Sequence, residues 1–64
     1  MSYTRIKYLR KQKNWSLRKL GLESGVSFVY IRELEEGKKK RPSLDVIERI
    51  ANALGATIFD LREN

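Results

Sequence analysis

Apolar side chains recur at three- and four-residue spacings along this chain, which is the spacing of one face of an α-helix. The clearest example is Leu44–Leu54, whose apolar positions follow the i, i+3, i+4, i+7 pattern. Shorter versions of the pattern cover four more segments: Thr4–Lys13, Leu17–Ser24, Phe28–Glu36 and Ile58–Arg62. No segment alternates with a period of two over a useful length. The pattern therefore predicts an all-α fold with five helices.

Residues that start and stop helices lie between these segments. The expected N-caps are the hydroxyl residues Ser16, Ser27, Ser43 and Thr57. The expected helix ends are followed by residues that tolerate the left-handed conformation: Asn14, Gly25, Gly37 and Gly55. There is no repeat, low-complexity tract or interdomain linker. We therefore predict one compact domain spanning residues 1–64.

A short turn that contains Gly25 joins the second and third predicted helices. A glycine in left-handed conformation lets two helices meet at a steep angle, as in a helix-turn-helix. In that arrangement the N-terminal part of the second helix enters the DNA major groove, and the first helix crosses the backbone. Helix–glycine–helix corners also occur in many proteins without this function, so the turn alone indicates a class of structure rather than an activity.

The charge of the chain is unevenly distributed. The 64 residues include 14 Lys and Arg and 8 Asp and Glu, and the sequence pI is near 10.0. Residues 1–32 hold eight bases and one acid, a net charge of +7, whereas residues 33–64 hold six bases and seven acids, a net charge of −1. A basic half predicts contact with a polyanion. The alternative is a solvated surface that keeps the domain soluble.

Several classes of function are disfavoured by what the chain lacks. Without Cys or His it has no disulfide framework, no Cys/His zinc site and no imidazole base, and we expect no metal, no cofactor and no enzymatic activity. The longest apolar run, Phe28 to Ile31, is four residues, against about 20 for a membrane span. The N-terminus has no apolar signal-peptide region, so we expect a cytoplasmic protein.

A longer stretch carries a family resemblance. The sequence SGVSFVYIRELEEGKKKRPSLDVIERIANALG, preceded by RIKYLRKQKNWSLRKL, resembles the lambda-repressor-like helix-turn-helix family, also called the Cro/repressor or XRE type. That family runs Gly-Val-Ser-x-x-x-Ile-Ser-x-Ile-Glu-x-Gly, a basic linker, Pro-Ser, and a helix ending in Ala-x-x-Leu-Gly. The resemblance covers about residues 5–61. It implies a DNA-binding domain of bacterial or phage origin.

The resemblance implies roles for particular residues. The positions that face the DNA bases are Ser27, Phe28, Val29, Arg32 and Glu33. Arg32 can donate two hydrogen bonds to guanine, Glu33 can accept from cytosine, and Phe28 or Val29 can contact a thymine methyl. For Phe28 and Val29 the alternative is core packing. For Glu33 the alternative, which we prefer, is a surface acid that phosphate repels or that pairs with Arg32.

Other matched positions imply contacts to the DNA backbone. The expected phosphate contacts are Leu17, Arg18, Tyr30, Lys38, Lys39, Lys40 and Arg41. Leu17 and Arg18 would offer backbone N–H groups at a helix N-terminus, Tyr30 its hydroxyl or else only packing, and the linker residues their charge. Arg10 and Glu35 match a family ion pair that orients the third helix. Leu17 stands where many members have Gln, which removes a side-chain contact.

These expectations define two hypotheses. The first is a sequence-specific regulator of transcription, acting as a repressor, that binds an inverted repeat in double-stranded DNA as a homodimer. The second is a protein-interaction or antitoxin-like module whose helix-turn-helix mainly contacts a protein. Phe59 and Leu61, on the last helix, are the candidates for self-association. No small-molecule effector site is expected, and no membrane partner.

Overall fold

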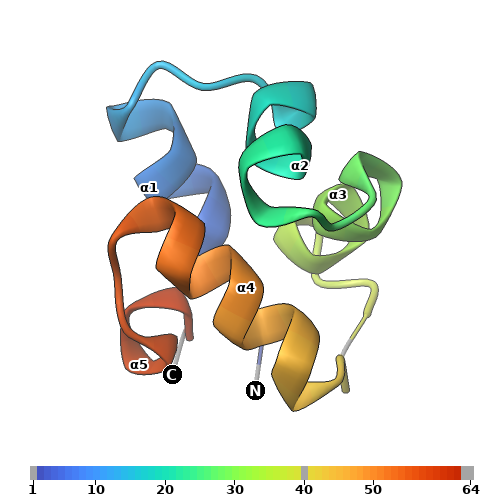
Figure 1. Cartoon of the computed structure of the whole chain (residues 1–64). Coiled ribbons are helices and arrows are strands. Elements are labelled where there is room, and N and C mark those ends of the chain that lie inside the picture. The colour runs from blue at the N-terminus through green and yellow to red at the C-terminus, as the bar shows by residue number, and fades with distance from the viewer. Residues whose placement is uncertain (1, 40, 63–64) are drawn as a thin grey trace.

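The computed structural model describes residues 2–39 and 41–62, and these residues form five helices (Figure 1). The helices are α1 (Arg5–Gln12), α2 (Leu17–Ser24), α3 (Phe28–Glu35), α4 (Leu44–Leu54) and α5 (Ile58–Leu61). The prediction of an all-α fold with five helices is confirmed. In this part of the chain no helix is long and apolar enough to cross a membrane.

Three predicted helix ranges were slightly too long. The predicted helix 4–13 is α1, one residue shorter at each end, because Thr4 is the N-cap and Lys13 leaves helical geometry at φ −92° and ψ 1°. The predicted helix 28–36 is α3, which ends one residue earlier because Glu36 is its C-cap. The predicted helix 58–62 is α5, because Arg62 is extended at ψ 142°.

Side-chain caps determine where most of these helices begin. The hydroxyl oxygens of Ser16, Ser27 and Ser43 accept hydrogen bonds from backbone N–H groups in the first turns of α2, α3 and α4. Thr57 and Asp60 form a reciprocal capping box at the start of α5. Gly25, at φ +73°, ends α2 in the left-handed conformation that glycine adopts without a steric penalty. The polar pattern of the sequence thus positions the helices.

The core lies where all five helices meet. Its fully buried side chains are Ile6, Leu20, Ile31, Leu34, Ile47, Ile50 and Leu61. Figure 1 shows α4 running across the middle of the domain, and its buried face packs against α2 and α5. Full burial of one such side chain stabilises the fold by about 1.5–3 kcal/mol. In the α2–α3 unit, α2 packs against α4 and α3 packs against α1.

Candidate nucleic-acid interface

Hydrogen bonds made by Ser24 hold the turn between α2 and α3. The buried Ser24 hydroxyl donates to the carbonyl of Leu20 at 2.7 Å and accepts from the backbone N–H of Val26 at 3.2 Å. At Gly21, a Cβ would lie 3.0 Å from the carbonyl oxygen of Val26 and 3.5 Å from the Cβ of Phe28. The missing side chain at Gly21 therefore lets the start of α3 lie close against α2.

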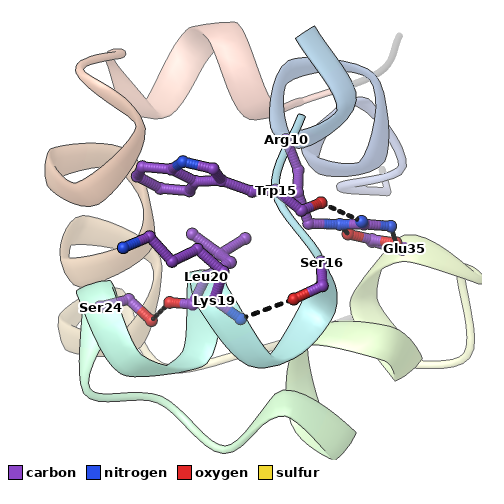
Figure 2. Close-up of polar contacts among 7 residues, drawn as sticks. All are labelled: Arg10, Trp15, Ser16, Lys19, Leu20, Ser24 and Glu35. Atoms are coloured by element: carbon purple, nitrogen blue, oxygen red, sulfur yellow. Dashed lines mark hydrogen bonds and ion pairs between the residues drawn. The ribbon is translucent and has the colours of Figure 1, made fainter. Parts of the chain in front are cut away.

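A buried ion pair fixes α3 relative to α1. In Figure 2 the guanidinium of Arg10 faces the carboxylate of Glu35, with Nε–Oε2 at 2.7 Å and Nη2–Oε1 at 3.0 Å. The remaining terminal nitrogen, Nη1, donates to the carbonyl of Trp15 at 2.7 Å. Hydrogen bonding to Glu35 raises the pKa of Arg10 above its usual value. The family resemblance implied the pair; the Trp15 contact had no signal in the sequence, since it needs the path of the 13–16 loop.

The outer face of α3 presents the residues that were expected to contact bases. Ile31 and Leu34 are buried on the inner face, whereas Ser27 and Arg32 are exposed and Val29 is 41% exposed. Core packing was one of the two predicted alternatives for Val29, and its exposure argues against that alternative. Arg32 has no acidic side chain within ion-pair distance among residues 2–39 and 41–62. An unpaired guanidinium on an exposed helix face is free to bind a polar ligand.

Phe28 and Arg18 come together across the turn. Phe28, half-buried at the start of α3, lies beneath the guanidinium of Arg18 from α2, with Cζ 4.5 Å from the ring centroid. The contact between these two side chains was not predicted, because the residues are ten apart and meet only through the geometry of the turn. A cation over an aromatic face at this distance is attracted by the ring and restricted in its motion.

The linker lysines fold back onto α3. Lys38 Nζ lies 3.3 Å from Glu36, and Lys39 Nζ lies 4.0 Å from Glu33 and 4.6 Å from the ring centroid of Tyr30. The alternative that Glu33 pairs with Arg32 is wrong, since its cationic neighbour is Lys39. The backbone N–H groups of residues 38 and 39 donate hydrogen bonds to the carbonyl of Glu33. These bonds turn the chain back over the end of α3, which brings the two lysines close to the two acids.

The other backbone candidates differ in how exposed they are. Arg41 is exposed, and Lys40 lies outside the described residues. Leu17 is half-buried against the core, in the first position of α2, where its side chain packs rather than contacts a ligand. Within residues 2–39 and 41–62, Arg18, Arg32 and Arg41 have no carboxylate within ion-pair distance, whereas Lys38 and Lys39 each have one.

The self-association candidates on α5 lie in opposite environments. Phe59 is 78% exposed, with the guanidinium of Arg62 5.8 Å from its ring centroid. Leu61 is completely buried, so its assignment to a dimer surface was wrong. A helix of four residues is too short for periodicity to show which face is buried, and Leu61 is the residue that α5 contributes to the core.

Comparison with protein families identifies the architecture. The family model described as helix-turn-helix matches residues 6–61, which include both halves of the α2–α3 unit and the Arg10–Glu35 pair. The chain belongs to the helix-turn-helix family. This agrees with the resemblance found in its sequence.

Relatives of this helix-turn-helix chain are named as transcriptional regulators. The chain is 32% identical over 56 residues to SlrR and 32% identical over 57 residues to SinR, both of Bacillus subtilis (strain 168). These matches cover 88% and 89% of the chain, and 37% and 51% of the two regulators. The chain is also 30% identical over 59 residues to DdrOP3 of Deinococcus deserti, covering 92% of the chain and 45% of that protein. The chain thus spans about half the length, or less, of the curated relatives it matches.

A solved structure has the same fold. A chain from the SinR protein/SinI protein complex superposes with a TM-score of 0.89 at 30% identity, over 100% of this chain and 62% of that one. That fold likeness covers every helix described above. The name of that structure records a complex of the SinR protein with the SinI protein.

Proposed function

We propose that this chain is the DNA-binding domain of a bacterial transcriptional regulator, acting in the cytoplasm as a repressor, with no enzymatic activity of its own. In this proposal α3 enters the major groove of double-stranded DNA and the linker after α3 lies along the phosphates. The observation that carries it is the outer face of α3, where Arg32 is exposed and unpaired among the described residues, on a helix that the buried Arg10–Glu35 pair holds in place.

Each interface residue has a role in this proposal. Arg32 donates two hydrogen bonds to a guanine, and Val29 contacts an adjacent base methyl. Arg41 and the N-terminus of α2 bind phosphate, where backbone N–H groups and positive charge both favour an anion. Lys39 binds phosphate after exchanging its contact with Glu33 for one with DNA. Glu33 is then a partner of Lys39 and not a reader of cytosine.

The domain is expected to bind as a dimer, because one unit of this size buries little DNA surface. Two copies on an inverted repeat would place their α3 helices about one turn of DNA, or 10 base pairs, apart. Leu61 is buried in the core and cannot contribute to the contact between copies, which leaves Phe59 as the exposed apolar residue on α5.

Selection of bound sites from a random duplex library at near-physiological salt tests this function. We expect an enriched inverted repeat with half-sites about 10 base pairs apart. Arg32→Ala should relax the preference at one base pair of each half-site by about 1–3 kcal/mol. Weak binding to every duplex, with no enriched sequence, would contradict the proposal.

The second candidate function is a protein-binding module. Two observations favour it: the fold neighbour was solved as a complex with a second protein, and Leu22 and Phe59 are exposed apolar side chains at 82% and 78%. Salt separates the two functions. Binding to several phosphates weakens steeply as salt rises, whereas an apolar protein contact does not.

A further inference from the structure

Positive side chains near α2 and α3 fall into two groups. Three lysines have a carboxylate within ion-pair distance, in the pairs Lys19–Glu23 (3.0 Å), Lys38–Glu36 (3.3 Å) and Lys39–Glu33 (4.0 Å). On α2 and α3 themselves, two cations have no carboxylate partner within the described ranges, and both are guanidiniums: Arg18 and Arg32. The acids of this region therefore pair with lysines and leave the guanidiniums of Arg18 and Arg32 available to a ligand.

An aromatic ring holds the guanidinium of Arg18, although no carboxylate pairs with it among the described residues. Its guanidinium carbon lies 4.5 Å from the ring centroid of Phe28, which is the first residue of α3. A guanidinium that stacks on a ring has one face covered, while the N–H groups around its edge stay available for hydrogen bonds. The contact thus places the hydrogen-bond donors of Arg18 beside the N-terminal end of α3, which is the end that enters the major groove in the proposed function.

A shallow hollow of about 320 Å³ lies beside this stack. Its lining residues are Arg18, Gly21, Leu22, Val26, Ser27 and Phe28. Most of these are apolar or lack a side chain, and the hydroxyl oxygen of Ser27 already caps α3. A phosphate is bound by several converging donors and cations, whereas this hollow offers one planar fork beside apolar walls. That combination suits the edge of a base better than a phosphate group.

We propose that Arg18 is a second guanine reader, held in position by the ring of Phe28. The inference rests on the proposed function and adds to it a specificity-determining residue on α2. Phe28 and Arg32 lie four residues apart on α3, which is about 6 Å along the helix. Successive base pairs are about 3.4 Å apart. Arg18 and Arg32 therefore address different base pairs of one half-site, about one to two steps apart. Phe28 acts as a positioning residue.

The test compares base preferences across a set of variants in duplex-library selection, followed by competition binding to single-base variants of the enriched site. Arg18→Ala removes the guanidinium together with its charge. Phe28→Leu keeps an apolar side chain but loses the ring. Lys7→Ala, on the exposed side of α1, is the control for loss of one positive charge. Thermal melting followed by circular dichroism verifies that each variant is folded.

We expect Arg18→Ala to lose preference for guanine at one base pair by about 5- to 150-fold. Phe28→Leu should lose preference at the same base pair and add little to Arg18→Ala in the double variant. The guanine read by Arg32 should keep its preference in all of these variants, and Lys7→Ala should keep both preferences.

Two results would overturn the inference while the proposed function stands. One is an unchanged base profile in Arg18→Ala. The other is a uniform loss of affinity for all sequences in Arg18→Ala, which would make Arg18 a phosphate contact. If the wild-type domain enriches no sequence at all, the proposed function fails, and this inference fails with it.

Discussion

The buried pair of Arg10 and Glu35 offers the sharpest test of how this domain is held together. Arg10 is 7% exposed and Glu35 is 8% exposed, and their two hydrogen bonds join residues 25 positions apart. The informative changes are Arg10→Met, Glu35→Leu and the double variant. Each single change leaves one buried charge without its partner, whereas the double change removes both charges and replaces them with apolar side chains.

The magnitudes follow from burial and hydrogen bonding. Breaking a buried ion pair by removing one partner costs about 3–5 kcal/mol, whereas replacing both with apolar residues is about neutral or stabilising. The carbonyl of Trp15 loses its 2.7 Å donor in Arg10→Met and in the double variant, which costs about 1–3 kcal/mol. We therefore expect Glu35→Leu to lose about 3–5 kcal/mol, Arg10→Met about 4–8 kcal/mol and the double variant at most about 3 kcal/mol.

These losses are large for a domain of this size. At about 0.05–0.15 kcal/mol per residue, 64 residues have a total stability of about 3–10 kcal/mol. The assay is urea unfolding followed by circular dichroism on all four proteins, which gives the coupling free energy of the pair as a double-mutant cycle. We expect a coupling above about 3 kcal/mol. If the two single losses simply add in the double variant, the pair does not act as a unit and this reasoning is refuted.

Three further predictions concern other parts of the structure. Glu33→Gln should raise affinity for all duplexes alike by releasing Lys39; loss of preference at one base pair would instead make Glu33 a base reader. The backbone N–H of residue 57 holds the pKa of Asp60 below its usual value, so its stabilising effect is present above about pH 4 and is lost as pH falls through the folded pKa. Melting temperatures of wild type and Asp60→Asn should therefore converge towards pH 2; a constant difference would contradict this. Leu61→Ala should cost about 2–5 kcal/mol in urea unfolding and Phe59→Ala less than about 0.5, because only Leu61 is buried; equal losses would argue against that placement.

The sequence predicted those parts of the fold that depend on local chemistry. Ser16 and Gly25 bound α2 at the predicted residues, because capping and left-handed geometry involve only neighbouring positions. Apolar spacing placed α4 from Leu44 to Leu54, because eleven residues give three turns of pattern. The assignment of Leu61 to a dimer surface was wrong, since α5 is too short for its sequence to show a buried face.

The candidate site was predictable in outline and not in its contacts. Spacing and resemblance placed Arg32 on the outer face of α3, where the structure has it exposed. The positions of Lys39 against Glu33 and of Arg18 over Phe28 depend on how the chain turns after α3 and before it. Such contacts join elements across a turn, and periodicity within one helix carries no information about them.

The position of Leu61 in the core also bears on how the domain forms during synthesis. α1 and α5 pack against each other, and Arg5 Nε donates to the carbonyl of Asp60 across 55 residues of sequence at 3.1 Å. The α2–α3 unit is complete by residue 35, yet the core it rests on stays open until α5 leaves the ribosome. We therefore expect that a nascent chain that carries the whole basic half does not yet present it as a folded surface, and that the domain folds only when α5 has emerged.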